Sequence, residues 1–339
     1  MTLSLFLMVD LAGCAAEKKK EELNLYWPLP PDPPRIRYVK SFTDSKEVLP
    51  PKSFFRKAIS FLFGEEERPR LMRPYGIYIG GPGKIFVTDT DLQVVHLFDF
   101  TSQNYRQFFR IPGGRLRSPV GVVADSENNV YVTDSELGRV FQFNSEGAFM
   151  KVWETQFTRP TGIALDLKRK VFYVIDTAEH HALVFNIKGE KLYDFGKRGD
   201  AEGEFNFPTH VAVNPENGDV YISDSMNFRI EQFSSDGKFI KQIGSSGSRI
   251  GNFSKLKGLS VDSRGIVYAV DGLFDTVQMF NEKGEFLLNF GKAGNHEGEF
   301  WLPAGIAVFQ DLIYVADSYN QRVEIFKLID SSNPDGASQ

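Results

Sequence analysis

The chain has little of several residue types, and each scarcity excludes a class of protein. Its 339 residues include one cysteine, Cys14, so a disulfide within the chain is impossible. The five histidines form no His-Glu-x-x-His motif, and neither a P-loop nor a nucleophile elbow is present. The apolar run at residues 3–9 is too short to span a membrane. The formal net charge of −5 argues against the concentrated basic surface that nucleic acid requires.

What the sequence does contain is one unit repeated six times. Each copy has an aspartate with Phe or Tyr three residues before it and Phe nine residues after it. The six aspartates are Asp89, Asp134, Asp176, Asp224, Asp271 and Asp317, and successive ones are 42 to 48 residues apart. A period of about 40 to 50 residues with short strands is the signature of β-propeller blades.

Each copy contains four β-rich runs. In the fourth copy these are residues 209–213, 220–223, 229–233 and 238–244, and Asn, Pro, Asp and Gly separate them. Four such runs make one antiparallel blade. The sequence therefore predicts an all-β fold, a six-bladed β-propeller over residues 73–329, which is large enough to bury a core as one domain.

Three short patterns recur within the copies. Pro-x-Gly-(aliphatic) opens the first run, (aromatic)-(aliphatic)-x-Asp-(Ser/Thr) ends the second, and Asn-x-Arg-(aliphatic)-x-x-Phe forms the third. Together they resemble the NHL repeat, most fully at Asp224–Arg229 and Asp317–Arg322. Elsewhere the Arg position holds Val94, Arg139, His181 and Thr276. The resemblance implies a propeller, and propellers host binding modules and enzymes alike.

The sixth copy lacks its outer strand, since a polar tail follows residue 328. Residues 35–42 alternate in the same way as the outer strands of the other copies. We expect this segment to pair with the last blade, which would remove an exposed edge and join the two ends of the chain.

The N-terminus resembles a bacterial lipoprotein signal. An apolar run is followed by Leu11-Ala12-Gly13-Cys14, and the resemblance implies a signal peptide at 1–13 and lipidation of Cys14. The protein would then be anchored in the cell envelope, on the periplasmic side of a membrane in a Gram-negative bacterium. The alternative is an ordinary N-terminal strand with a free thiol.

The remaining segments flank the propeller. Residues 14–34 form a charged, Pro-rich tether, and the closing strand occupies 35–45. A helical insert at 46–72 contains a helix over 52–63, whose apolar face packs either on the propeller or on the membrane surface. Residues 330–339 are a disordered tail.

The aspartates have two interpretations. They converge toward one rim of the channel and so could bind a hard cation. Alternatively, each accepts backbone N–H groups in the turn that follows, which Asp-Ser and Asp-Thr favour, and we prefer this interpretation.

A zinc site is also unsupported by the histidines. The peptidyl-hydroxyglycine lyase, a zinc enzyme of this fold, has metal histidines just after the proline of the inner strand. That position here holds Tyr75, Val120, Thr161, Thr209, Lys257 and Ala304. His210 is one residue further on, and alternation turns its side chain to the other face. The sequence predicts no catalytic set, no metal and no cofactor.

Without a catalytic set or a metal site, the sequence favours a binding face on the propeller. The loop entering each inner strand and the turn after each aspartate lie at the same end of a blade. The ligand-binding candidates there are Tyr75, Thr161, His181, Thr209, Arg229, Lys257, Trp301, Tyr319 and Arg322. Longer inter-blade loops at 197–207, 244–257 and 291–302 border this face, with Phe205, Phe253 and Phe300 expected to fill the spaces between blades.

The function expected from these observations is a lipid-anchored binding or assembly module. Its partner would be an envelope protein, a peptide or a glycan, and the protein would be a monomer that does not bind nucleic acid. The alternative is a metal-dependent hydrolase or lyase with its site at the channel mouth.

Overall fold

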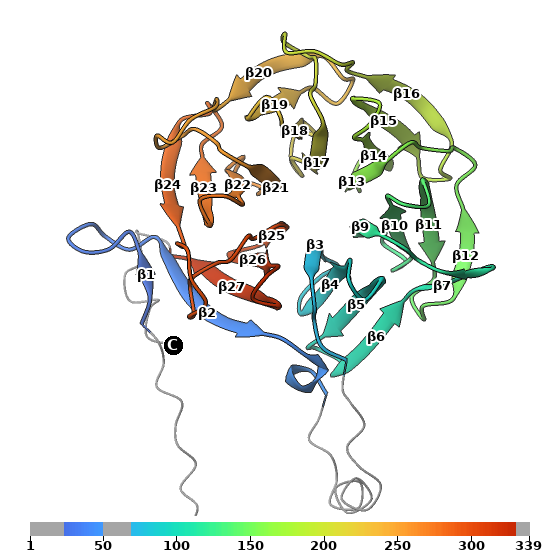
Figure 1. Ribbon diagram of the computed structural model, residues 1–339, viewed down its shortest axis with the longest axis horizontal. Helices are drawn as coiled ribbons and strands as arrows, with labels where there is room; N and C mark the ends of the chain where they lie inside the picture. Colours follow the sequence, from blue (N-terminus) through green and yellow to red (C-terminus); the bar gives the residue numbers. More distant parts are fainter. Residues whose placement is uncertain (1–23, 50–68, 330–339) are drawn as a thin grey trace, which may run out of the picture.

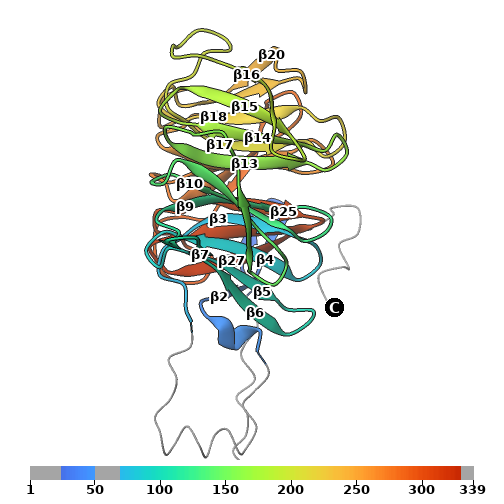
Figure 2. The same cartoon turned by 90° about the vertical axis from the view of Figure 1, so that its right-hand side faces the viewer.

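Six antiparallel sheets surround a central channel in the computed structural model, which describes residues 24–49 and 69–329 (Figure 1). Seen from its edge, the propeller is a disc (Figure 2). The predicted signal peptide, Cys14, the predicted helix at 52–63 and the tail at 330–339 lie outside the described residues. Within the described ranges the one helical segment is the 3-10 turn η1 (Ser45–Glu47), and no helix there could cross a membrane.

Five blades follow one another along the chain, each ordered from the channel outward. Blade 1 contains β3 (Pro74–Ile79), β4 (Lys84–Asp89), β5 (Val94–Asp99) and β6 (Asn104–Phe108); blade 2 contains β9 (Pro119–Ala124), β10 (Val130–Asp134), β11 (Arg139–Phe143) and β12 (Phe149–Val152). Blade 3 contains β13 (Pro160–Asp166), β14 (Val171–Asp176), β15 (His181–Asn186) and β16 (Lys191–Phe195); blade 4 contains β17 (Pro208–Val213), β18 (Val220–Asp224), β19 (Arg229–Phe233) and β20 (Phe239–Ile243). Blade 5 contains β21 (Leu256–Val261), β22 (Val267–Asp271), β23 (Thr276–Phe280) and β24 (Phe286–Phe290). A short hairpin of β7 (Arg110–Ile111) and β8 (Gly114–Arg115) follows blade 1.

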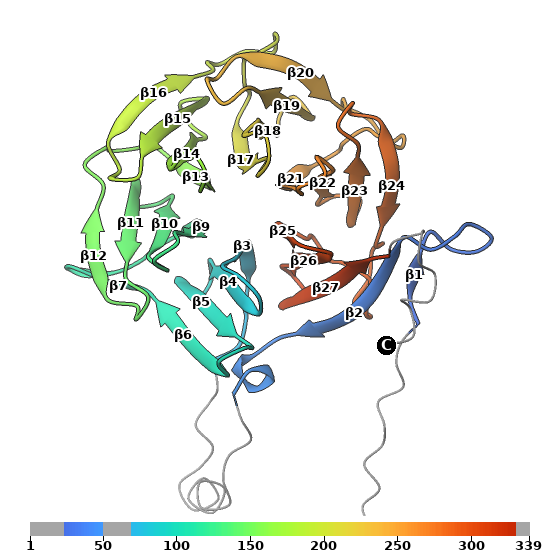
Figure 3. The same ribbon diagram turned by 180° about the vertical axis from the view of Figure 1, so that it is seen from behind.

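Blade 6 joins the two ends of the described chain. Its strands β25 (Ile306–Phe309), β26 (Leu312–Asp317) and β27 (Arg322–Leu328) are followed outward by β2 (Ile36–Phe42) and β1 (Tyr26–Trp27). β2 pairs antiparallel with β27 from Ile36 opposite Leu328 to Phe42 opposite Val323. β2 occupies the place that the sequence predicts for residues 35–42, and the view from behind shows it completing the ring (Figure 3).

Aromatic residues fill the spaces between blades. The repeated Phe of each third strand is buried, as are Phe205, Phe253 and Phe300, which are all 0% exposed. The expectation that these three side chains fill the inter-blade spaces is confirmed. Burying an aromatic ring of this size stabilises the fold by about 1.5 to 3 kcal/mol.

The inner strands approach one another closely at a glycine. A Cβ atom added to Gly76 would lie 2.2 Å from the Val120 carbonyl oxygen of the next blade, and one added to Gly305 would lie 2.2 Å from the Tyr75 carbonyl oxygen. Five of the six copies have Gly at this position, and the fourth has His210. The Pro-x-Gly pattern is therefore a packing requirement of the narrow end of each blade.

Candidate ligand-binding site

The six repeated aspartates connect the loops of the face on which the inner strands begin. All six are buried. Asp89 accepts from the backbone N–H groups of Met72 (2.7 Å) and Arg73 (3.1 Å), which precede β3, and from Leu92 in its own turn (3.0 Å). Asp176 accepts in the same way from Arg159 N–H (2.9 Å). The interpretation of the aspartates as acceptors in the following turn holds for Asp89, Asp134 and Asp271. All six accept a backbone N–H group from the loop before the inner strand, and these bonds hold the backbone of Arg73 and Arg159 in place.

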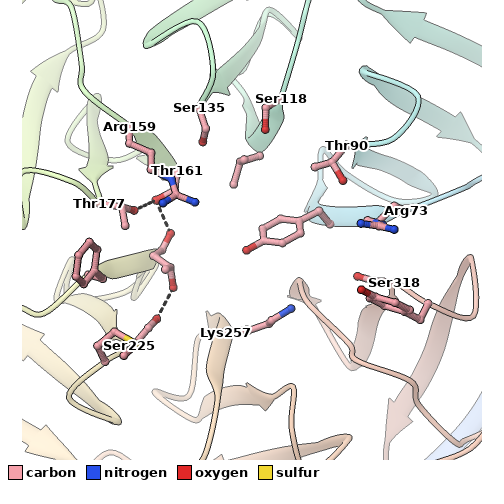
Figure 4. A pocket seen from close by; sticks show the side chains of 16 residues that line it. Arg73, Thr90, Ser118, Ser135, Arg159, Thr161, Thr177, Ser225, Lys257 and Ser318 are labelled. Atoms are coloured by element: carbon pink, nitrogen blue, oxygen red, sulfur yellow. Dashed lines mark hydrogen bonds between the residues drawn. The ribbon is translucent and has the colours of Figure 1, made fainter.

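These connected loops surround a cavity of about 620 Å³ at the mouth of the channel, which we call the cup (Figure 4). The cup is lined by Arg73, Tyr75, Thr90, Ser118, Val120, Ser135, Arg159, Thr161, Thr177, Phe207, Thr209, Ser225, Met226, Lys257, Ser318 and Tyr319. Three of these residues are cations, ten have hydroxyl groups, and none is Asp or Glu. Its volume is in the range typical of small-molecule and peptide pockets.

The structure brings six of the nine sequence-predicted residues together. Tyr75, Thr161, Thr209, Lys257 and Tyr319 line the cup. The sixth, Trp301, lies beside Tyr319 at its edge, with ring centroids 5.6 Å apart. Trp301 is 53% exposed and Tyr319 is 44% exposed, so both rings are accessible to a partner.

Arg229 and Arg322 require a correction, because neither lines the cup. Arg322 is buried, its Nε donates to Asp317 (2.9 Å), and its Nη2 pairs with Glu324 (2.7 Å). It also donates to the carbonyl oxygens of Asn295 and His296 in an inter-blade loop. Arg229 makes the equivalent bonds in blade 4. Their donors are used within the protein, so these arginines hold the loops at 197–207 and 291–302 and are not ligand contacts.

His181 is also outside the cup. It begins β15, is partly buried, and its Nδ1 lies 3.6 Å from the Asp194 carboxylate of β16, toward the outer side of the blade. The sequence correctly places residue 181 just after the turn. The alternation of side chains along a strand does not reveal that this side chain points toward the outer strand β16.

Sequence reasoning missed two of the three cations and most of the hydroxyl groups. Arg73 and Arg159 each precede the proline of an inner strand, and Thr90, Ser135, Thr177, Ser225 and Ser318 each follow a repeated aspartate. The signal was present in the Arg-Pro and Asp-(Ser/Thr) pairs. To use this signal, one must know that the Arg-Pro pair and the Asp-(Ser/Thr) pair of a copy, 16 to 18 residues apart in sequence, meet at one face of the propeller.

Tyr75, which lines the cup, packs against His210. Tyr75 comes from blade 1 and His210 from blade 4, across the channel, and their rings stack with centroids 5.8 Å apart. His210 is not one of the residues that line the cup, but its ring lies against one of them, Tyr75. The other five copies have Gly at this position, so the fourth copy is the one that places a side-chain ring against Tyr75.

Burial sets the charges of Tyr75, His210 and Lys257. It lowers the pKa of His210 to about 3, with a further contribution from Lys257, so the imidazole is neutral at pH 7. Burial also lowers the pKa of Lys257 to about 8, with Lys255 and Arg73 adding to the effect. It raises the pKa of Tyr75, whose hydroxyl therefore keeps its proton. Lys257 lies 5.6 Å above the Tyr75 ring as a cation–π contact.

No group of three or more His, Cys, Asp or Glu side chains in residues 24–49 and 69–329 is arranged to hold a metal ion. His296 is an exposed loop residue. His96 is buried against Asp89 and Tyr105, and the His180 Nδ1 atom accepts from the Phe207 backbone N–H group (3.1 Å). The histidines are therefore distributed among separate blades and loops.

The fold and the repeat together define the class of protein. Residues 116–143, 205–233 and 300–326 match the NHL repeat, so the chain is a six-bladed β-propeller that contains NHL repeats. Relatives include protein brain tumor of Drosophila melanogaster (28% identical, 34% of this chain and 10% of that protein) and peptidyl-glycine alpha-amidating monooxygenase of Mus musculus (33% identical, 38% and 13%). The chain thus spans only about a tenth of the length of these relatives.

Solved structures show the same architecture. Virginiamycin B lyase from Staphylococcus aureus has a TM-score of 0.56 and 11% identity, over 76% of this chain and 95% of that chain. A structural genomics protein of unknown function from Bacteroides thetaiotaomicron has a TM-score of 0.61 and 17% identity, over 76% and 70%. At such identities the likeness shows the fold alone.

Proposed function

We propose that this propeller is a binding module that recognises a protein or peptide with its cup face. The observation behind the proposal is the combination of an open, cationic cup with large apolar side chains around it. Exposed on this face are Phe207 (40%), Met226 (53%), Leu273 (59%), Phe274 (37%), Trp301 (53%) and Tyr319 (44%). We call these six residues the apolar rim.

The apolar rim is one-sided. Its members belong to the turns and loops of blades 4, 5 and 6, whereas Glu136 and Glu179 occupy the corresponding turns of blades 2 and 3. Aromatic residues and Met, surrounded by polar groups, are the residue types that dominate protein interfaces. An asymmetric rim also gives a bound chain one orientation across the cup.

We further propose that the module is tethered to a membrane of the cell envelope through lipid on Cys14. The support is the Leu-Ala-Gly-Cys sequence and the charged run at residues 17–22 between it and β1. With its partner at the cup, such a module would hold an envelope protein near the membrane.

Photoreactive residues on the cup face are expected to capture a partner more efficiently than those on the opposite face. Positions 198, 249, 274 and 296 test the cup face, and positions 167, 236 and 283, in turns at the other end of the blades, are the matched controls. Crosslinking would be carried out in intact cells, and the crosslinked products would then be compared by blotting. Equal or reversed capture would assign the functional surface to the other face or the outer wall.

Membrane association is expected to depend on Cys14. The variant Cys14→Ser should move from the membrane fraction to the soluble fraction, because serine cannot carry the lipid that we propose on Cys14. The measurement is fractionation after a high-salt wash, with Ser4→Ala as the control. A Cys14→Ser protein that remains with the membrane would contradict lipid anchoring and favour attachment through the predicted helix at 52–63.

A further inference from the structure

The cup contains positive charge that the protein does not neutralise. Arg73 pairs with Asp91 at 3.3 Å, and both groups are about half exposed. Arg159 and Lys257 form no ion pair with a carboxylate of the described chain. The lowered pKa of Lys257 reflects this lack, since burial and neighbouring cations disfavour its charge. An anion in the cup would stabilise the charged form of Lys257 and offset the repulsion from its neighbouring cations.

The hydroxyl groups of the cup complement the cations, because several have no hydrogen left to donate. Ser318 donates to the Pro74 carbonyl oxygen (2.6 Å). The hydroxyl groups of Thr161 and Thr177 share their two hydrogens among their mutual contact (2.7 Å) and the carbonyl oxygens of Thr209 (2.9 Å) and Pro208 (2.7 Å). A hydroxyl has one hydrogen, so these groups offer a ligand only lone pairs. They would accept N–H groups, which a peptide backbone has and a phosphate ion lacks.

An aromatic surface continues from the cations to the rim. The Arg73 guanidinium lies 5.2 Å from the centroid of the Tyr319 ring, and Tyr319 lies 5.6 Å from Trp301. A negative group held by the cations would therefore have the Tyr319 and Trp301 rings beside it. Such rings bind apolar and aromatic side chains well.

From these three observations we propose that the cup binds the carboxylate of a peptide, with the cations Arg159, Lys257 and Arg73 around it and an apolar neighbouring side chain on Tyr319 and Trp301. The proposal rests on the proposed function and names the chemistry that the cup face recognises. The carboxylate belongs either to a chain terminus or to an Asp or Glu side chain, and the same cations suit both.

Defined peptides test the proposal. The probes are N-acetyl-Leu-Phe with a free carboxylate, the same dipeptide as its amide, and N-acetyl-Glu-Phe-amide, whose carboxylate is on a side chain. Trp301 is far more exposed than the buried Trp153, so tryptophan fluorescence reports binding at the rim, and calorimetry gives an independent Kd. The free dipeptide is expected to bind at least about tenfold more tightly than its amide, because charge-assisted bonds are the stronger ones. Preference for the terminal or the side-chain carboxylate identifies the source.

The variant Lys257→Met is expected to remove most of this tenfold preference, with Lys255→Met as the matched control. Lys255 is exposed, does not line the cup, and has the same charge. Arg159→Gln should have an effect in the same direction as Lys257→Met, and melting temperatures would show that all three variants are folded. Because Lys257 is protonated below its pKa of about 8, the preference should decline as the pH rises from 7 to 9, while the Kd of the amide stays constant.

Several outcomes would overturn the proposal. Equal affinity for the acid and the amide, an unchanged preference in Lys257→Met, or no binding of either acid at several millimolar would each do so. Tighter binding of inorganic phosphate than of either acid would assign the cup to phosphate instead. The proposed function is tested separately, since a partner crosslinked at positions 274 and 296 would still establish the cup face as a binding surface.

Discussion

Deletion of residues 35–42 is expected to lower the free energy of unfolding by more than about 5 kcal/mol and to cause aggregation. The deletion removes β2, exposes the edge of β27 and uncovers the core that Ile36 (0% exposed) and Phe42 (1%) help to bury. A loss of this size is comparable to the whole stability of many domains, about 5 to 15 kcal/mol. The measurements are chemical denaturation and analytical size-exclusion chromatography.

A milder variant separates packing from the loss of backbone. The double variant Ile36→Ala and Phe42→Ala keeps β2 in place but removes its two buried side chains, each worth about 2 to 5 kcal/mol. Its control is Arg37→Ala and Val39→Ala, which changes the other face of the same strand, where Val39 is 41% exposed. If the double variant or the deletion melted like the parent protein, β2 would not be what stabilises the ring.

The second large effect is expected at the buried cluster of Asp317, Arg322 and Glu324. Replacing Arg322 by Met should lower the free energy of unfolding by about 3 to 5 kcal/mol. Two buried carboxyl groups and the loop carbonyl groups would lose the cation that pairs with them. The loop with His296 and Trp301 should also become more sensitive to proteolysis. Arg264→Met is the control, since that side chain is about half exposed and pairs with Asp262 from the surface. Equal effects of the two variants would contradict a special role of the buried cluster.

The same cluster predicts how stability changes with pH. Burial raises the pKa of Glu324 to about 8 and that of Asp317 to about 6, so the folded protein holds protons that the unfolded chain releases. Stability contributed by this protonation is present at low pH and is lost as the pH rises toward 8, by at most about 1.4 kcal/mol per pH unit for each group. In Glu324→Gln the decline between pH 5.5 and 7.5 should be smaller than in the parent protein. A decline of the same size would show that Glu324 does not hold the proton.

Much of the fold follows from local patterns in the sequence. The strands of blade 4 begin and end within a residue or two of the predicted runs, because Asn, Asp, Pro and Gly specify the turns between them. The role of residues 35–42 also follows from the pattern, since six copies with five outer strands leave one place empty. Regularity of the repeat is what made these features predictable.

The candidate site was predicted only in part, since it depends on contacts between different copies. Arg229 and Arg322 match the repeat at an apparently exposed position, yet each has a glutamate two residues later, Glu231 and Glu324. Alternation places such pairs on one face of a strand, and that face is buried between blades. The Arg-x-Glu spacing was therefore evidence for internal ion pairs. Arg73 and Arg159 belong to different copies, and only the folded ring brings both to one cavity.

The order in which the chain is synthesised gives the closing strand a further consequence. β2 emerges from the ribosome before blades 1 to 5, but its partner β27 is the last strand of the described residues to be made. During synthesis the edge of β2 that pairs with β27 stays unpaired, while blades 1 to 5 can form as hairpins one after another. A prematurely terminated product cannot close, so its open edge distinguishes it from the finished protein. The position of one strand thereby makes completion of the chain a condition for a sealed propeller.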